Sequence, residues 1–232
     1  ANKIIAANSY VAKLAGEIAA DNKIAIVNPG VDNRITHNAQ RITQIKEKYN
    51  LQNKLVLLQV GRLVERKGVD KVLKALPQVW QECAELAYVI VGDGPALEKY
   101  KLLVTSYKLQ NNVILITNAS DDEVDYWYEL GDIFIMPARE IDGDFEGFGI
   151  VYLEANAHGK PVIAGDSGGV RDAVANGVNG ILVNPTDVDE IAQAIIKLAK
   201  DEGLRKKLGE RGREWVQQFD WQSQVQKIIQ IL

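Results

Sequence analysis

The stretch Leu55-Val-Leu-Leu-Gln-Val-Gly-Arg-Leu-Val-Glu-Arg-Lys-Gly68 gives the first indication of the fold. A nearly continuous apolar run ends in a loop bounded by two glycines, and residues 69–81 then place apolar side chains at helical spacing. A strand that is apolar along its length is covered on both faces. The stretch therefore predicts a strand–loop–helix unit of a parallel sheet.

The same alternation recurs along the chain. Besides a run at 4–7, strands are predicted at residues 24–27, 55–60, 88–91, 113–116, 133–136, 162–164 and 181–183. Helices are predicted at residues 36–49, 69–81, 124–130, 188–200, 204–219 and 222–232. Strands that alternate with helices form right-handed crossovers, so we expect an α/β fold with a doubly wound, Rossmann-like parallel sheet.

Capping residues predict three of the helix starts. Ser120 and Glu123 have the spacing of a capping box. Pro95 follows a Gly-Asp-Gly turn and is predicted to occupy the first position of another helix. Thr186 is predicted to cap the helix at 188–200.

Composition restricts the class of protein. The 232 residues are 47% hydrophobic and 25% charged, as in globular domains, and the net charge of −4 does not favour a nucleic-acid partner. Cys83 is the single cysteine, which excludes a disulfide framework and a cysteine metal site. No apolar run approaches the ~20 residues of a membrane span. We therefore expect a cytoplasmic protein.

The chain divides into three parts. Residues 1–35 are rich in turn chemistry and are interpreted as a linker, and residues 36–218 as the main domain. The helix within 219–232 is expected to pack outside that domain. The chain starts without methionine or a signal-peptide pattern, and we expect it to be cut from a longer one.

Ligands of open parallel sheets bind beyond the carboxyl ends of the strands, where this chain has glycine-rich loops. The loop that begins at Gly61 carries Arg62 and Lys67. A guanidinium grips phosphate with two hydrogen bonds and an ammonium adds a point charge, so the pair matches a diphosphate. The alternative is a solvated loop with a structural ion pair through Glu65.

The stretch Glu146-Gly-Phe-Gly-Ile-Val-Tyr-Leu-Glu154 is the most informative about function. On one regular helix its two acids would point about 80° apart. The spacing is better explained if Glu146 lies in the loop and the helix opens within residues 147–149. Backbone N–H groups and the positive end of the helix dipole then lie between two carboxylates, which suits a diphosphate with a sugar on either side.

Each acid has two interpretations. Glu154 interrupts an apolar helix and needs a partner, either ribose hydroxyls or a buried salt bridge. Glu146 could contact a donor sugar and stabilise positive charge near the anomeric carbon, or be an ordinary surface acid.

Other candidate motifs are weaker. Asp142-Gly-Asp144 has the spacing of a metal-binding pair, but Arg62, Lys67 and the helix end already supply positive charge, so we expect no metal and interpret it as an acidic loop. His158 is predicted to have a structural role at a helix end. Neither a Walker loop nor a Gly-x-Gly-x-x-Gly motif follows the strand at 55–60.

The motifs together, in this order, resemble the donor half of the GT-B glycosyltransferases of group 1, which carry two glutamates separated by seven residues. The resemblance rests on Gly61-Arg62…Lys67-Gly68, Val91-Gly-Asp-Gly94, Glu146…Glu154, Gly159-Lys-Pro-Val-Ile-Ala164 and Gly168-Gly169. It implies that Arg62 and Lys67, in the loop from Gly61, hold the diphosphate of a nucleotide-diphosphate sugar.

The resemblance also implies that the backbone of Gly147, Phe148, Gly149 and Ile150 faces the phosphates and the sugar. Glu146 would be the catalytic residue and Glu154 would bind the ribose. No metal or other cofactor is implied, and the transfer would retain the anomeric configuration. Thr117-Asn118 stands where the family commonly has glycine, near the expected base, so the nucleobase is left open.

We therefore predict the donor-binding domain of a hexosyltransferase that acts on a glycan or lipid acceptor. Residues 1–31 resemble the end of the family's N-terminal acceptor domain, and the last helix would cross back to that domain. Without it, the chain is expected to bind donor but to transfer sugar poorly. The alternatives are a non-catalytic nucleotide-sugar-binding module and a GT-B phosphorylase or epimerase.

Overall fold

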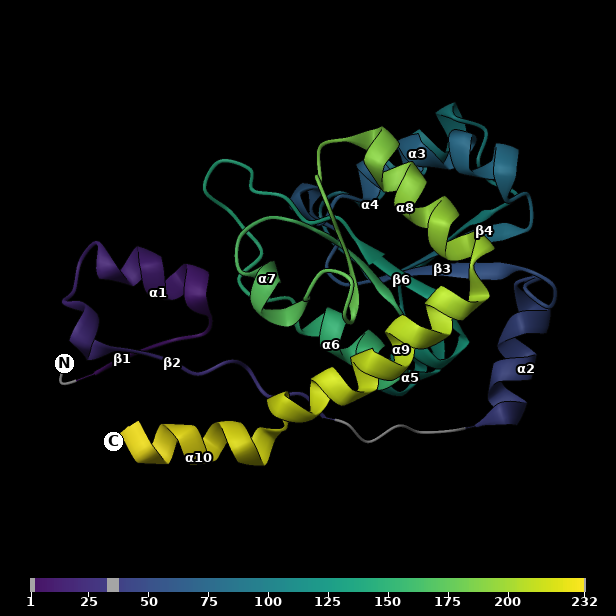
Figure 1. The fold of residues 1–232 in the computed structure, drawn as a ribbon. Coiled ribbons are helices and arrows are strands. Elements are labelled where there is room, and N and C mark those ends of the chain that lie inside the picture. The colour runs from purple at the N-terminus through teal and green to yellow at the C-terminus, as the bar shows by residue number, and fades with distance from the viewer. Residues whose placement is uncertain (1–2, 33–37, 232) are drawn as a thin grey trace.

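A computed structural model describes residues 3–32 and 38–231. Its centre is a six-stranded parallel sheet with the order β5-β4-β3-β6-β7-β8 (Figure 1). These strands are β3 (Leu55–Val60), β4 (Leu86–Val91), β5 (Val113–Ile116), β6 (Ile133–Met136), β7 (Val162–Gly165) and β8 (Gly180–Val183). The predicted doubly wound parallel sheet is confirmed, and the strand bounds differ from the predicted ones by at most two residues.

Helices cover both faces of the sheet. Across the described residues the α-helices are α1 (Ser9–Gly16), α2 (Ala39–Lys48), α3 (Val69–Glu82), α4 (Leu97–Ser106), α5 (Asp121–Leu130), α6 (Ile150–Ala157), α7 (Val170–Ala173), α8 (Val188–Lys200), α9 (Glu202–Val216) and α10 (Trp221–Ile231), of which α1 and α10 lie apart from the main sheet (Figure 1). One core cluster joins α3, α4 and α8 to one face, and a second joins α2, α5, α6 and α7 to the other. Neighbouring residues of a strand alternate between them: Leu57 belongs to the first cluster and Leu58 to the second.

The strand order reverses between β3 and β6. The chain proceeds outward from β3 through β4 to β5, and then returns to β6 beside β3 before proceeding through β7 to β8. The loops that follow β3 and β6 therefore leave the same edge side by side. This is the position at which open α/β sheets bind ligands.

The first residues form a separate unit. Strands β1 (Ile4–Ala6) and β2 (Ile24–Ile26) pair in parallel, with α1 between them, so the predicted strand at 24–27 does not join the main sheet. The Ser9 hydroxyl donates to Asp172 at 2.5 Å, and the Tyr10 ring meets the Phe145 ring at 4.8 Å. The unit thus contacts the loop after β6 and the short helix α7.

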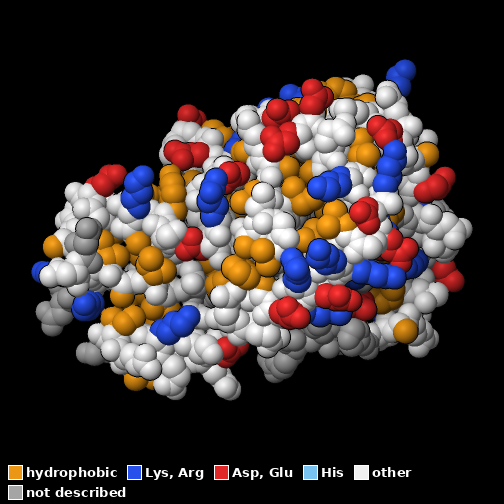
Figure 2. All heavy atoms as spheres, viewed as in Figure 1, with side chains coloured by type: hydrophobic (Ala, Val, Ile, Leu, Met, Phe, Trp, Pro, Cys, Tyr) orange, Lys and Arg blue, Asp and Glu red, His pale blue; other side chains and the backbone are white. Residues whose placement is uncertain are grey.

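Helix α10 lies close to the segment that follows β2. Val31 N donates to Phe219 O at 2.9 Å, and Gly30 packs against the Trp221 ring. Figure 2 shows apolar side chains gathered over α10 and the N-terminal unit. The exposed ones include Ile5, Leu14, Ile18, Ile26, Trp221, Val225 and Ile229. The expected division at residues 35 and 218 stays a prediction.

Of the three helix starts predicted from capping residues, one is confirmed and two differ from the structure. The capping box of Ser120 and Glu123 is present at the start of α5. The cap of α8 is Asp187, one residue after Thr186, because its carboxylate accepts from two backbone N–H groups. Pro95 precedes the N-cap residue Ala96 rather than opening α4. The helices α1 and α7 were not predicted, and residues 36–37 of the helix predicted at 36–49 lie outside the described residues.

Candidate functional site

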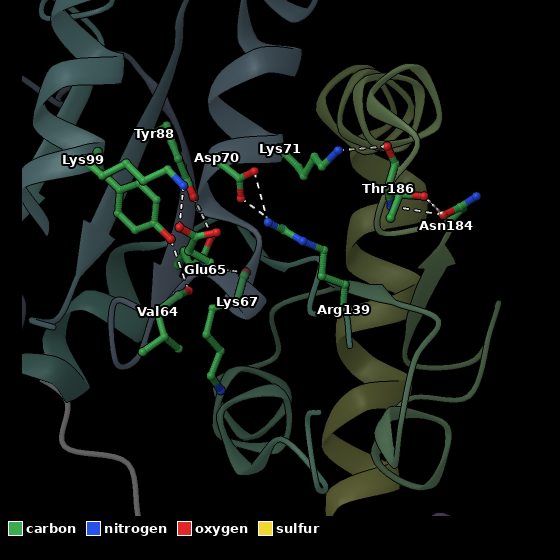
Figure 3. Close-up of polar contacts among 12 residues, drawn as sticks. Val64, Glu65, Lys67, Asp70, Lys71, Tyr88, Lys99, Arg139, Asn184 and Thr186 are labelled. Carbon is green, nitrogen blue, oxygen red and sulfur yellow. Dashed lines mark hydrogen bonds and ion pairs between the residues drawn. The ribbon is translucent and has the colours of Figure 1, made fainter. Parts of the chain in front are cut away.

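The loop after β3 is held by its neighbours at several points. Leu63 N donates to Asp93 O at 2.8 Å, and the Tyr100 hydroxyl donates to Val64 O at 3.1 Å. Lys99 of α4 forms an ion pair with Glu65 at 2.5 Å (Figure 3), and this hydrogen bond lowers the pKa of Glu65. The structural ion pair considered for Glu65 therefore exists, but it does not involve Arg62 or Lys67.

A buried polar pair fixes the end of this loop. The side-chain Nε2 of Gln59 donates to Lys67 O at 3.0 Å, and the Tyr88 hydroxyl donates to Gln59 Oε1 at 2.5 Å. Both side chains are almost fully buried. Figure 3 shows the Lys67 side chain pointing away from the Glu65–Lys99 pair. The backbone is thus fixed while the ammonium group of Lys67 projects elsewhere.

Lys67 projects onto Glu146. Its ammonium group forms an ion pair with Glu146 Oε2, and Arg66 Nη1 binds the same oxygen at 2.8 Å. Glu146 is only 7% exposed, so its interpretation as an ordinary surface acid is wrong. Two cations on one carboxylate offset the cost of taking its charge out of water.

Arg66 was not predicted as a site residue. It joins Glu146 to Asp144 through a second hydrogen bond, from Nε at 3.0 Å, and its backbone carbonyl accepts from Arg139 N at 2.8 Å. The loops after β3 and β6 are thereby connected. A basic residue beside Lys67 was the available signal, but only the tertiary structure gives it two acidic partners.

Arg62 differs from the other two cations of its loop. Its side chain is exposed, and it makes no hydrogen bond or ion pair with any residue that the structure describes. An anion that arrives at this edge can therefore be gripped by the whole guanidinium group.

Turn chemistry accounts for the Asp142-Gly-Asp144 sequence. Ile141 and Asp144 exchange two backbone hydrogen bonds at 2.9–3.0 Å. Asp142 (φ 52°) and Gly143 (φ 81°) take the two left-handed positions between them, as a tight hairpin requires. The Asp144 carboxylate is paired with Arg66.

Helix α6 begins between the two glutamates. Its N-cap is Gly149 with φ 83°, and a Cβ added there would lie 2.4 Å from the Tyr152 ring. Glycine is required at this position by its backbone conformation and by the close contact. Glu146 lies in the preceding loop, where its carbonyl accepts from Gly169 N at 2.9 Å. The side chain of Phe148 is buried against Phe219, whereas Ile150 is exposed.

Glu154 faces a different part of the molecule. The Tyr128 hydroxyl of α5 donates to Glu154 Oε2 at 2.6 Å. The half-buried Glu154 lines a hollow of about 400 Å³ together with Asp32, Asp121, Asp122, Val124, Asp125, Tyr128, Ala157 and His158. Glu154 forms no salt bridge among the described residues, so the buried salt bridge considered for it is not found there. Its hydrogen-bond partner is the neutral phenol of Tyr128.

The two glutamates are thus related by one short helix. Along the axis of α6, Glu154 lies about 7.5 Å beyond the N-cap Gly149, since each residue rises 1.5 Å. The structure brings Lys67 and Glu146 into contact and places Arg62 on the same loop. It places Glu154 in the hollow between α5 and α6. Both helices begin at the carboxyl edge of the sheet, where the loop after β3 also lies.

His158 is the C-cap residue of α6, as its predicted structural role requires. Its Nε2 lies 2.9 Å from Asp125 Oδ1 and its Nδ1 lies 3.4 Å from Glu129 Oε2. Along the described residues, 3–32 and 38–231, no helix is long and apolar enough to cross a bilayer.

Comparison with known proteins identifies related sequences. The family model described as "Glycosyl transferases group 1" matches residues 41–215. A GDP-mannose-dependent α-(1-6)-phosphatidylinositol monomannoside mannosyltransferase of Mycolicibacterium smegmatis is 34% identical over 208 residues, which cover 88% of this chain and 54% of that protein. An uncharacterised glycosyltransferase of Methanocaldococcus jannaschii is 30% identical over 99% of this chain and 59% of its own. The chain therefore spans just over half the length of these relatives.

Solved structures share the fold. HepE of Anabaena, determined in complex with UDP, matches with a TM-score of 0.89 at 22% identity over 99% of this chain and 63% of its own. Sucrose-phosphate synthase of Thermosynechococcus elongatus matches with a TM-score of 0.85 at 25% identity over 100% and 57%. These matches confirm the expected sheet architecture of one half of a GT-B enzyme.

Proposed function

This chain belongs to the group 1 glycosyltransferases, and we propose that its site binds the nucleotide-diphosphate sugar from which a hexose is transferred. The observation that supports this most directly is that charged side chains and the start of a helix come together where the strand order reverses, between β3 and β6. Arg62 lies without a partner among the described residues, Lys67 and Arg66 meet at Glu146, and the N-cap residue of α6, Gly149, follows three residues later. This arrangement suits a diphosphate in contact with the loop cations and the helix N-terminus.

We assign Glu146 to the transferred sugar. The carboxylate is held against Lys67 and Arg66 and lies ahead of the helix, so a hexose attached to the diphosphate would reach it. Its oxygens can accept hydrogen bonds from sugar hydroxyls and stabilise positive charge that develops at the anomeric carbon. We include retention of the anomeric configuration in the proposal, with this carboxylate as the catalytic group.

We assign Glu154 to the ribose and the acceptor to a further domain. A carboxylate accepts from two neighbouring hydroxyls, and Glu154 lines an open hollow. The relative from Mycolicibacterium smegmatis acts on a phosphatidylinositol mannoside, and we propose a glycan or lipid acceptor here as well. The exposed apolar side chains of the N-terminal unit and α10 suit contact with the domain that would bind it.

Calorimetric titration of the folded chain with GDP, UDP, ADP and their hexose conjugates tests the proposal. We expect saturable binding of at least one of them. Arg62→Ala should weaken it by about tenfold, because charge-assisted hydrogen bonds to phosphate are lost. The matched control is Lys74→Ala, which removes an exposed cation from α3. If none of the compounds binds to folded protein, the proposal is wrong.

A further inference from the structure

Glu154 is held by a buried neutral phenol rather than by a cation among the described residues. Tyr128 is only 3% exposed, and its hydroxyl lies 2.6 Å from Glu154 Oε2. Burial, helped by the nearby charge of Glu154, raises the pKa of Tyr128 well above its ordinary value. The phenol therefore remains a hydrogen-bond donor, and it orients the carboxylate without neutralising its charge.

The Tyr128 ring is itself fixed from two sides. It stacks on the His158 ring, with ring centroids 5.5 Å apart and an interplanar angle of 23°. It also packs against the Phe134 ring of β6, with ring centroids 5.9 Å apart. His158 is held between the carboxylates of Asp125 and Glu129. The hydroxyl consequently has a defined position, set by α5, α6 and the sheet together.

This arrangement leaves one oxygen of Glu154 available. Tyr128 occupies Oε2, and within the described parts of the chain no residue donates to Oε1. The hollow that Glu154 lines also carries Asp121 and Asp122 from the first turn of α5. Such an acidic surface disfavours phosphate and favours a neutral group that donates hydrogen bonds.

We propose that Tyr128 is a positioning residue that holds Glu154 so that its Oε1 accepts the ribose hydroxyls, and that this contact makes the site select ribonucleotides over deoxyribonucleotides. The inference rests on the proposed function, since it requires a nucleotide to bind. Tyr128 acts through Glu154 in this arrangement, because its hydroxyl is engaged by Oε2. A merely structural hydrogen bond would stabilise the fold without affecting the choice of sugar.

The test compares two forms of one nucleotide. The ligands are GDP or UDP, whichever binds the wild-type chain more tightly, its 2′,3′-dideoxy counterpart, and inorganic pyrophosphate. We expect the wild type to prefer the ribonucleotide. Tyr128→Phe keeps the ring and should weaken ribonucleotide binding by about tenfold, which corresponds to about one hydrogen bond to a charged group. Binding of the dideoxy form and of pyrophosphate should be unchanged.

Tyr126→Phe is the matched control. Tyr126 lies on the same helix and, within the described residues, its hydroxyl makes no hydrogen bond. The control should keep the wild-type preference for ribose. Circular dichroism of each variant verifies that it is folded. Should Tyr128→Phe not fold, Glu154→Gln tests the contact from the other side, because an amide offers only one acceptor oxygen and should lose the preference.

The outcomes separate the two proposals. Equal weakening of the ribonucleotide and the dideoxy form by Tyr128→Phe, or no weakening of either, overturns the positioning role while the proposed function stands. Retention of the ribose preference by Glu154→Gln overturns it as well. If the wild type binds no nucleotide at all, the proposed function itself is wrong.

Discussion

Glu146 and Glu154 lie at either end of one short segment and are held in opposite ways. Glu146 is buried and contacts two cations, Lys67 and Arg66. Glu154 is half-buried beside an open hollow and contacts the neutral hydroxyl of Tyr128. The first arrangement compensates charge with two cations, whereas the second orients a carboxylate that has no cationic partner among the described residues.

The difference shows what each position requires. A carboxylate out of water needs compensating charge, and removal of that charge is costly. A carboxylate beside water needs only a fixed direction, which one hydrogen bond supplies at little electrostatic gain. We therefore expect the Glu146 side of the site to depend on charge and the Glu154 side to depend on geometry.

The largest effect is expected from Lys67→Met. The variant leaves the buried Glu146 carboxylate with Arg66 alone, and we expect the free energy of unfolding to fall by about 3 kcal/mol. Chemical denaturation measures the change. The addition of Glu146→Gln to the same chain should recover more than half of the loss, because the uncompensated charge is removed. Without such recovery, charge compensation would not be the reason for the pairing.

A smaller loss of stability is expected from Tyr128→Phe. One hydrogen bond to a carboxylate is lost, but water can reach the half-buried Glu154, so we expect a decrease of about 1 kcal/mol in the free energy of unfolding. The Tyr126→Phe variant should be neutral in the same denaturation experiment. A loss as large as that of Lys67→Met would contradict the contrast between the two glutamates.

Alkaline pH should reduce the difference between wild type and Tyr128→Phe. The phenol ionises near pH ~10 in the unfolded chain, whereas its pKa is raised in the folded chain by burial. Above that pH the unfolded state holds fewer protons, so the stability of the wild type falls as pH rises. The variant lacks this group, so its free energy of unfolding should fall less steeply with pH than that of the wild type. The difference in slope should be up to about 1.4 kcal/mol per pH unit. Tyr88 and Tyr152, whose pKa values are also raised by burial, contribute equally to both proteins.

Unfolding curves at a series of alkaline pH values provide this measurement. The difference between the two proteins should be constant below about pH 9 and should narrow above it. Parallel curves across the whole range would mean that Tyr128 ionises equally in both states.

The smallest effect is expected from Arg66→Lys. Arg66 uses Nε for Asp144 and Nη1 for Glu146, and an ammonium group cannot reach both in the same way. Asp144 is exposed, so its pairing is screened and we expect a loss of about 0.5 kcal/mol. Denaturation at low and high salt should show the loss shrinking as salt rises, whereas the control Lys74→Arg should show no change. A loss that is independent of salt would point to packing rather than to charge.

Much of the fold could be predicted from local patterns. Continuous apolar runs identified every strand of the main sheet, and the capping box at Ser120 identified the start of α5. The predictions failed where several local signals compete: Asp187 caps α8 although Thr186 precedes it, and Pro95 lies outside α4. Helix α7 has four residues, too few to show a helical period, and α1 lies within the stretch interpreted as a linker, so neither helix was predicted.

The candidate site could be predicted only in part. The residue types that bind phosphate and sugar are visible in the sequence, and so is the glycine that begins α6. The partners of those residues are not visible, because Arg66 meets Asp144 and Glu146 across 78 and 80 residues of chain. Tyr128 gave no signal at all, since an aromatic residue in an amphipathic helix is most simply interpreted as core.

The sequence by itself determined the alternation of strands and helices, the glycine-rich loops at one sheet edge and the placement of Glu146 ahead of a helix. These properties depend on the period of the backbone and on the conformations that single residues allow. Only the tertiary structure decided that Glu146 pairs with two cations, Lys67 and Arg66, and that Glu154 is oriented by the hydroxyl of Tyr128. Such pairings depend on which side chains the sheet order brings within hydrogen-bond distance, and no local pattern encodes that distance.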